Sequence, residues 1–251
     1  MLSSPARRAG VALVVVGLVF TLAGCKPDSI LGLSMDDEVK LGRQSGDQFE
    51  AKYGRCLDRD LNAEVAGIGR RISALARPPD YPYDYRVLNA KEVNANAFPG
   101  GRIYVWMGLI NRIGRDPDKL AFVIGHETTH VAHRHTARVV ERAMGYDLAI
   151  QIITGGKNSE KYASAVAGLM LQGFGRQNEY EADQYGVQFA HDAGYDPTAA
   201  YAVIHEFQRM SGNKDPNSME LLFDTHPGNN DRLSAIRREI ERNGWHGKFK
   251  P

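Results

Sequence analysis

Apolar side chains recur at helical spacing along most of this chain, and the pattern changes to alternation in one stretch. Between residues 57 and 76 the apolar positions lie three or four apart, which predicts a helix that ends before Pro78 and Pro79. An earlier helix is predicted from Ser34, a good N-cap residue followed by acidic residues, to about Tyr53. The folded part of the chain is therefore expected to begin with two helices.

The alternating stretch predicts a small sheet. Residues 83–88 alternate and are rich in β-forming types. Residues 93–98 and 102–106 flank a Pro-Gly-Gly sequence that is typical of a turn, so we expect a hairpin there. Together these segments predict an antiparallel sheet of about three strands.

A buried helix is expected after the sheet. Asp116 and Pro117 form a helix start, with Asp at the N-cap and Pro at the first helical position, and we expect the helix to run to about Met144. Residues 121–124 are apolar on all sides, which predicts a place in the core. Gly125 in this helix would let a strand or a substrate backbone pass close by.

Helices are also predicted for the rest of the chain. Their approximate ranges are 148–153, 159–171, 178–192, 196–210 and 230–242. Neither a repeat nor a change of composition indicates a second domain. We therefore expect an α+β fold, a single and mostly helical domain over residues 34–251, with the small antiparallel sheet packed against the helix around residue 126.

The N-terminus has the pattern of a secretion signal. A basic pair precedes Val11–Ala23, an uncharged apolar run of 13 residues, which is shorter than the roughly 20 residues of a spanning helix. The run ends in Leu-Ala-Gly-Cys, which resembles the bacterial lipobox, so we expect cleavage after residue 24 and a lipid on Cys25. Residues 25–33 would then be the lipidated tether. The alternative is an ordinary signal peptide with an incidental cysteine.

Composition adds little beyond ordinary globular character. The chain has 43% hydrophobic and 24% charged residues and a formal net charge of +1, which gives no reason to expect nucleic acid. There are two cysteines. If Cys25 carries a lipid, Cys56 has no partner within the chain, so the fold cannot depend on an internal disulfide.

The strongest candidate chemistry lies in the buried helix, where residues 126–130 spell His-Glu-Thr-Thr-His. His126 and His130 are four apart and share one helix face, where two imidazoles can bind one metal ion. Glu127 can take a proton from a water molecule on that metal. The alternative is a pair of core histidines with a surface glutamate.

A catalytic zinc ion needs a third protein ligand and one open position. Glu179 and Asp183 are four apart and share a helix face, whereas Glu181 points elsewhere. This spacing favours Glu179 on the metal and Asp183 behind it, accepting a hydrogen bond from a ligand imidazole. The alternative is an acidic helix face in solvent.

His133 is a rival for the third position, because it lies seven residues after His126 on nearly the same face. Three ligands along one straight helix would span roughly 10 Å and could not converge on one tetrahedral ion. We therefore expect His133 and His135 to support the site or to pack near it.

Four segments, in this order, resemble the gluzincin metallopeptidase family that includes HtpX and the CAAX prenyl protease, and within it the periplasmic lipoprotein branch of LoiP and BepA. The segments are residues 94–101, residues 126–130, residues 178–183, and Thr-His-Pro at 225–227 with Arg232. BepA carries a C-terminal repeat domain, whereas this chain ends soon after its last predicted helix. We therefore expect a closer likeness to LoiP.

The resemblance implies one zinc ion per chain. Its implied ligands are His126, His130 and Glu179, with Glu127 as the base. The resemblance also implies that His226 and Arg232 lie across the cleft and stabilise the oxyanion, and that His226 can occupy the open metal position in a resting state.

The function expected from these features is that of a zinc endopeptidase that hydrolyses unfolded or misassembled envelope proteins. We expect substrate to pair with the strand around Asn96 and Ala97 by β-addition. By resemblance to enterobacterial sorting, Lys26 after the lipobox indicates the outer membrane, with the domain facing the periplasm. The alternative function is a lipid-anchored chaperone or assembly factor with a structural zinc site. Glu127 argues against it, because a structural site needs no base.

Overall fold

The computed structural model describes residues 32–76, 80–212, 226 and 229–251. The expected signal peptide, the lipidated Cys25 and Lys26 lie outside these ranges and stay predictions, as do the domain boundaries. Within the described ranges, no helix is both long enough and apolar enough to cross a membrane.

The protein is mostly helical with one small sheet, so the predicted α+β class is confirmed. In chain order the elements are α1 (Met35–Tyr53), α2 (Arg59–Ser73), β1 (Asp84–Leu88), β2 (Ala95–Ala97), η2 (Pro99–Gly101), β3 (Arg102–Trp106), α3 (Met107–Ile113), α4 (Pro117–Ala132), α5 (His135–Met144), α6 (Tyr146–Ile153), α7 (Ser159–Leu169), α8 (Arg176–Asp192), α9 (Ala199–Gly212) and α11 (Asn229–Arg242).

The predicted helix starts are present. Ser34 caps α1 with a reciprocal pair of hydrogen bonds to Asp37, in which each side chain accepts from the other residue's backbone N–H. Asp116 caps α4 by accepting from the first-turn amides of Asp118 and Lys119. Local sequence therefore decides where these two helices begin.

The sheet has the order β1-β3-β2 and is mixed. β2 and β3 form the expected antiparallel hairpin, but β1 pairs with β3 in parallel, so the expectation of a wholly antiparallel sheet was wrong for β1. The connection from β1 crosses the end of β3 near Gly108, whose N–H donates to Ala90 O at 2.9 Å. A Cβ at Gly108 would lie 2.2 Å from two backbone oxygens of this connection. The crossing places β2 on the far side of β3, where it runs opposite to both other strands.

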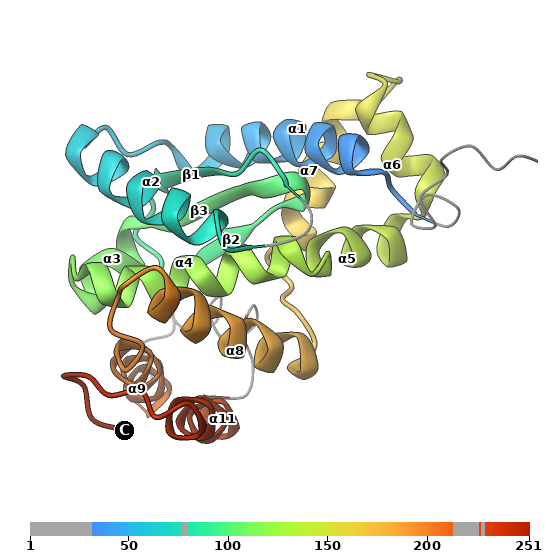
Figure 1. Cartoon of the computed structure of the whole chain (residues 1–251). Coiled ribbons are helices and arrows are strands. Elements are labelled where there is room, and N and C mark those ends of the chain that lie inside the picture. Colours follow the sequence, from blue (N-terminus) through green and yellow to red (C-terminus); the bar gives the residue numbers. More distant parts are fainter. Residues whose placement is uncertain (1–31, 77–79, 213–225, 227–228) are drawn as a thin grey trace, which may run out of the picture.

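The elements form layers that can be followed from top to bottom in Figure 1. α1 lies along one side of the sheet and α4 along the other, while α2 packs beside β1 and also contacts α4. α8 packs along α4 on the side away from the sheet, and α9 and α11 lie beyond it. α4 is consequently enclosed by the sheet and by α8, which confirms the predicted burial of residues 121–124.

The predicted single helix from Pro117 to Met144 is broken in the structure. α4 ends at Ala132, Arg134 adopts a left-handed conformation with φ 56° and ψ 25°, and α5 begins at the next residue. Such a conformation costs a residue with a side chain roughly 1–2 kcal/mol.

Arg134 is held in that conformation by the N-terminal part of the protein. Its Nε donates to buried Glu38 at 2.7 Å, and its Nη2 donates to Leu33 O at 2.8 Å. The Leu33 N–H in turn donates to Glu141 of α5 at 2.9 Å. Because these partners lie far away in sequence, the spacing of apolar residues gave no sign of the break.

Gly125 allows a close approach, but the backbone that passes it belongs to α8. A Cβ at Gly125 would lie 2.8 Å from Gly186 O, and a Cβ at Gly186 would lie 2.9 Å from His126 N. Two glycines therefore face each other where α4 crosses α8. The expectation of a strand or a substrate at this position was wrong.

Candidate metal centre

The two crossed helices bring three of the predicted ligands together. α4 supplies His126 and His130, and α8 supplies Glu179. The Nε2 atoms of the two histidines lie 3.1 Å apart, and the Glu179 carboxylate oxygens lie 3.6 Å and 3.4 Å from them. With His226, these side chains offer four ligand atoms that all lie within 4.8 Å of one another.

The chemistry of these groups fits a metal ion. Burial lowers the pKa of both His126 and His130, which keeps the rings in the neutral form that binds metals. Glu179 Oε1 is buried and has no hydrogen-bond partner among the described residues. Two imidazole nitrogens and an unpartnered carboxylate oxygen thus face one point, and this nitrogen and oxygen set is typical of catalytic zinc.

Asp183 lies behind His126. Its Oδ1 is 3.0 Å from His126 Nδ1, and it accepts two hydrogen bonds from Arg232, each 2.7 Å long. Burial alone would raise the pKa of Asp183, but the Arg232 charge outweighs it and lowers the pKa below the ordinary value. Ionised Asp183 therefore accepts the His126 Nδ1 proton, which leaves the His126 Nε2 lone pair for a metal.

Arg232 is buried, and most of its guanidinium group binds Asp183. Its Nε and Nη2 bind Asp183, and Nη1 lies 3.3 Å from Glu179 Oε2 and donates to His226 O at 3.4 Å. Only Nη1 therefore points toward the ligand set. Its implied role in stabilising an oxyanion stays a prediction.

Glu127 is buried beside the ligands, with 2% of its surface exposed. Its Oε2 has no hydrogen-bond partner within the described part of the chain, and its Oε1 lies 3.5 Å from His226 Nε2. Burial raises the pKa of Glu127 above its ordinary value, which moves the carboxylate toward the range of an effective general base.

His226 lies between Glu127 and the ligand atoms of Glu179 and His126. Its Nδ1 lies 3.0 Å from Glu179 Oε2 and 3.4 Å from His126 Nε2. Burial would lower the pKa of His226, but the Glu179 and Glu127 carboxylates outweigh it and raise the pKa. His226 therefore adds a fourth ligand atom to the cluster of His126, His130 and Glu179. Its implied occupation of the open metal position in a resting state stays a prediction.

His133 does not join the ligand set and instead turns toward Glu181, its Nδ1 2.8 Å from Glu181 Oε1. His135 Nε2 lies 3.0 Å from the other Glu181 oxygen, and His135 Nδ1 lies 3.0 Å from His130 Nδ1. Burial and the neighbouring His130 lower the pKa of His135 to about 3, so this ring is neutral. The contact between His135 and His130 was not predicted, because it depends on the break at Arg134.

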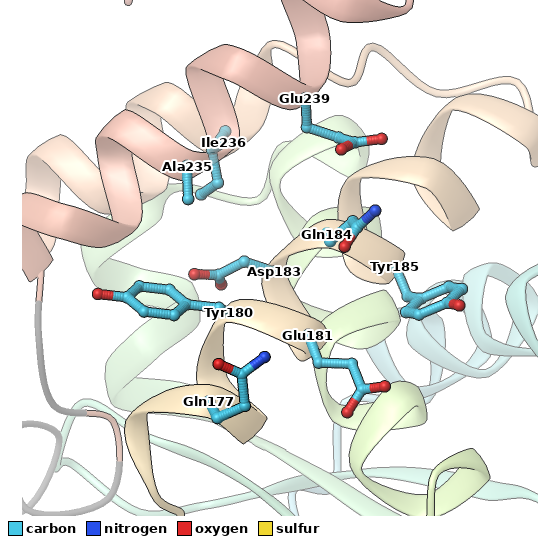
Figure 2. A pocket seen from close by; sticks show the side chains of 9 residues that line it. All are labelled: Gln177, Tyr180, Glu181, Asp183, Gln184, Tyr185, Ala235, Ile236 and Glu239. Carbon is cyan, nitrogen blue, oxygen red and sulfur yellow. The ribbon is translucent and has the colours of Figure 1, made fainter.

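Glu181 also faces a solvent-accessible pocket of about 280 Å³ between α8 and α11. Figure 2 shows Tyr180, Glu181 and Asp183 on α8, with Ala235 and Ile236 on α11 opposite them. Glu181 thus borders water on the outer side of α8, whereas Asp183, which also lines the pocket, is only 1% exposed.

The strand expected to bind substrate is covered in this structure. Asn96 and Ala97 lie in β2 at the edge of the sheet and are buried. Asn96 Nδ2 donates to Met170 O at 3.0 Å, and further along the same segment Phe174 stacks on the His130 ring at 3.8 Å between centroids. Residues 170–174, which connect α7 to α8, therefore lie over both the edge strand and the metal centre. The role of Asn96 and Ala97 in substrate binding stays a prediction.

Two histidines four apart on a buried helix, a glutamate from a second helix and a buried glutamate beside them define a metallopeptidase centre. Residues 59–240 match the family model described as Peptidase family M48, and the chain belongs to this family.

Several curated proteins are similar to this chain. The beta-barrel assembly-enhancing protease of Yersinia pestis is 30% identical over 224 residues, which cover 84% of this chain and 45% of that protein. Metalloprotease LoiP of Escherichia coli is 24% identical over 251 residues, with 92% of this chain and 97% of LoiP covered. The mitochondrial metalloendopeptidase OMA1 of Schizosaccharomyces pombe is 27% identical and covers 81% of this chain and 61% of OMA1. The chain spans less than half the length of the beta-barrel assembly-enhancing proteases that it matches.

Proposed function

We propose that this protein is a zinc-dependent endopeptidase with one zinc ion per chain, held by His126, His130 and Glu179. The observation that supports this most strongly is the convergence of these buried ligands beside Glu127, whose Oε2 has no hydrogen-bond partner within the described part of the chain. Membership of the M48 family adds that the substrate is a polypeptide.

Glu127 would act as the base. A bound zinc ion supplies a Lewis acid that acidifies water and polarises the scissile carbonyl. Glu127 accepts the proton of the attacking water and later gives it to the leaving amine. His226 and the Nη1 group of Arg232, which lie beside Glu127 and Glu179, would stabilise the oxyanion. His226 has to leave its present position before substrate can enter.

Substrate would bind as an added strand along β2, next to Asn96 and Ala97. This edge becomes available when residues 170–174 move away from Asn96 and His130. An extended backbone is required for such pairing, so the proposal favours unfolded or misassembled chains as substrates.

We place the protein in the bacterial cell envelope. Residues 1–24 would be removed as a signal peptide, Cys25 would carry the lipid, residues 25–33 would form the tether, and residues 34–251 would face the periplasm as one domain, at the outer membrane. The likeness to a beta-barrel assembly-enhancing protease supports misassembled envelope proteins as substrates.

The test combines metal analysis with cleavage of an unfolded casein-type substrate. Glu127→Gln should keep the metal and lose at least about 10²-fold in cleavage rate, because the proton acceptor is gone. Glu179→Ala should lose both metal and cleavage. Unchanged proteolysis in Glu127→Gln would sink the mechanism, and full metal retention in Glu179→Ala would point to another third ligand, such as His226.

One observation favours a lipid-anchored chaperone or assembly factor with a structural zinc site. His226 adds a fourth ligand atom, and structural zinc sites have four protein ligands and no open position. In that case wild type would cleave no unfolded substrate, and Glu127→Gln would protect unfolded proteins from aggregation as well as wild type does.

A further inference from the structure

One carboxylate reaches the metal centre indirectly, through a second histidine. Glu181 Oε2 lies 3.0 Å from His135 Nε2, His135 Nδ1 lies 3.0 Å from His130 Nδ1, and His130 Nε2 faces the ligand set. His130 and His135 are fully buried, while Glu181 lies at the wall of the pocket in Figure 2. The chain of contacts thus runs from water outside α8 to the ligand atom of His130.

The protonation pattern along this chain follows from the chemistry of the rings. If His130 Nε2 offers its lone pair to a metal, the neutral ring carries its proton on Nδ1 and donates it to His135 Nδ1. His135 then carries its proton on Nε2 and donates it to the Glu181 carboxylate. Every buried nitrogen is satisfied in this arrangement, and it is the only arrangement of two neutral rings that leaves His130 Nε2 free.

The two metal-facing histidines are therefore supported in parallel ways. Asp183 contacts His126 directly, whereas Glu181 contacts His130 through His135. Glu179, Glu181 and Asp183 all come from the same stretch of α8. In a continuous helix, His135 would lie about 140° around the axis from His130, and the break at Arg134 brings the two rings together.

We propose that His135 and Glu181 are positioning residues that fix the tautomer and the orientation of His130 for metal binding. This inference rests on the proposed function, because it takes His130 as a ligand. Carboxylates behind ligand histidines are common in metal sites, and their removal typically weakens metal binding by about 10–100-fold.

The same residues could instead form a second metal site, but the hydrogen bonds from His130 through His135 to Glu181 exclude it. His133, His135 and Glu181 have ligand atoms close enough to hold a metal ion of their own. Such a site would need the lone pair of His135 Nε2, which would place the His135 proton on Nδ1 and force the His130 proton onto Nε2. Two neutral rings therefore cannot serve a second ion and the central ion together.

The experiment measures metal affinity by competition with a chromophoric chelator, with the folded state checked by circular dichroism. His135→Leu removes the acceptor for His130 and should weaken metal binding by about 10–100-fold. His135→Asn should restore most of the affinity, because its side-chain oxygen can accept at the position of Nδ1. His133→Asn is the matched control: it contacts the same carboxylate but not His130, and should bind metal like wild type.

Several outcomes would overturn the proposal. They are equal affinity in His135→Leu and wild type, failure of His135→Asn to restore binding, and equal losses in His135→Leu and His133→Asn. A second bound ion per chain that disappears in His133→Asn would also overturn it. If wild type binds no metal at all, the proposed function itself fails, which separates the two results.

Discussion

Arg134 connects α1 to the metal centre indirectly: it binds Glu38 of α1 and directly precedes His135, which contacts His130. Its left-handed backbone conformation is unfavourable for a residue with a side chain. An ion pair with Glu38, a carboxylate that is only 1% exposed, holds it there. Glu38 also accepts a hydrogen bond from Tyr81 at 2.7 Å. Removing Arg134 would leave the buried Glu38 carboxylate with weaker compensation, which is among the more destabilising changes a protein can undergo.

Glu38 gives the protein a measurable dependence on pH. Burial raises its pKa above the ordinary value of 4.5, although Tyr81 and Arg134 offset part of the effect. When a carboxyl group has a higher pKa in the folded state than in the unfolded state, the folded state binds its proton more tightly. The resulting stabilisation is greatest at pH values below the pKa of the unfolded state, and it is lost as the pH rises through the pKa of the folded state.

Glu38→Gln cannot titrate and should lose this dependence. In urea unfolding between about pH 4 and pH 7, the stability of the variant relative to wild type should therefore increase as the pH rises. A difference between the two proteins that stays constant over this range would contradict the expected titration of Glu38.

Among single residues, the sequence indicated the candidate metal-site residues that lie at regular helical spacing. The positions of His126, His130, Glu179 and Asp183 could be predicted because each pair lies four apart on a helix that is in fact regular there. His135 could not be paired with His130 in this way, since their contact requires a break held by residues of α1.

The crossing of α4 and α8 sets the distance between the ligand histidines and Glu179. Gly125 and Gly186 face each other at this crossing, and a side chain on either one would meet the backbone of the other helix. The glycines therefore determine how closely the two halves of the metal centre approach.

Gly125→Ala should push α8 away from α4. The extra methyl group would destabilise the fold by about 1–3 kcal/mol through overpacking, and metal affinity should fall because Glu179 moves with α8. Urea unfolding and chelator competition would measure the two effects.

The matched control is Gly168→Ala in α7, where an added Cβ meets nothing within 4 Å. It should stabilise the protein by about 0.5–1 kcal/mol, since alanine is the better helix former. If both substitutions behaved alike, the crossing would not control the site.

Elements were predictable where their cause is local. The caps at Ser34 and Asp116 and the hairpin around the Pro-Gly-Gly turn follow from adjacent residues. The parallel pairing of β1 with β3 was not predictable. Alternation of apolar and polar residues shows which face of a strand is buried, but it does not show which strand pairs with it or in which direction. The covering of β2 by Met170 likewise joins residues 74 positions apart.

The metal centre also joins distant parts of the whole molecule. Its ligand atoms come from α4, from α8 and from His226 ahead of α11, so a bound ion would link three segments that are far apart in sequence. A ligand that binds only the folded state stabilises it by mass action, by about 2.7 kcal/mol at a free concentration of 100 times Kd.

Removing the metal with a chelator should therefore lower the free energy of unfolding by a few kcal/mol, with recovery when zinc is added back. Denaturant unfolding of the metal-loaded and chelated protein would measure the change. Glu179→Ala, which lacks one ligand, should show little response to the chelator. An equal response in that variant would mean that the stabilising metal is bound elsewhere.

The contacts of Leu33 have a mechanical consequence. The Leu33 N–H donates a hydrogen bond to Glu141, and the Leu33 carbonyl accepts one from Arg134. Leu33 also directly precedes Ser34, the N-cap of α1. A force that pulls on the chain ahead of Leu33 would act on Arg134 before it could unwind α1. Because Arg134 sets the angle between α4 and α5, tension at this end of the protein would be transmitted to His135 and from there to the metal centre.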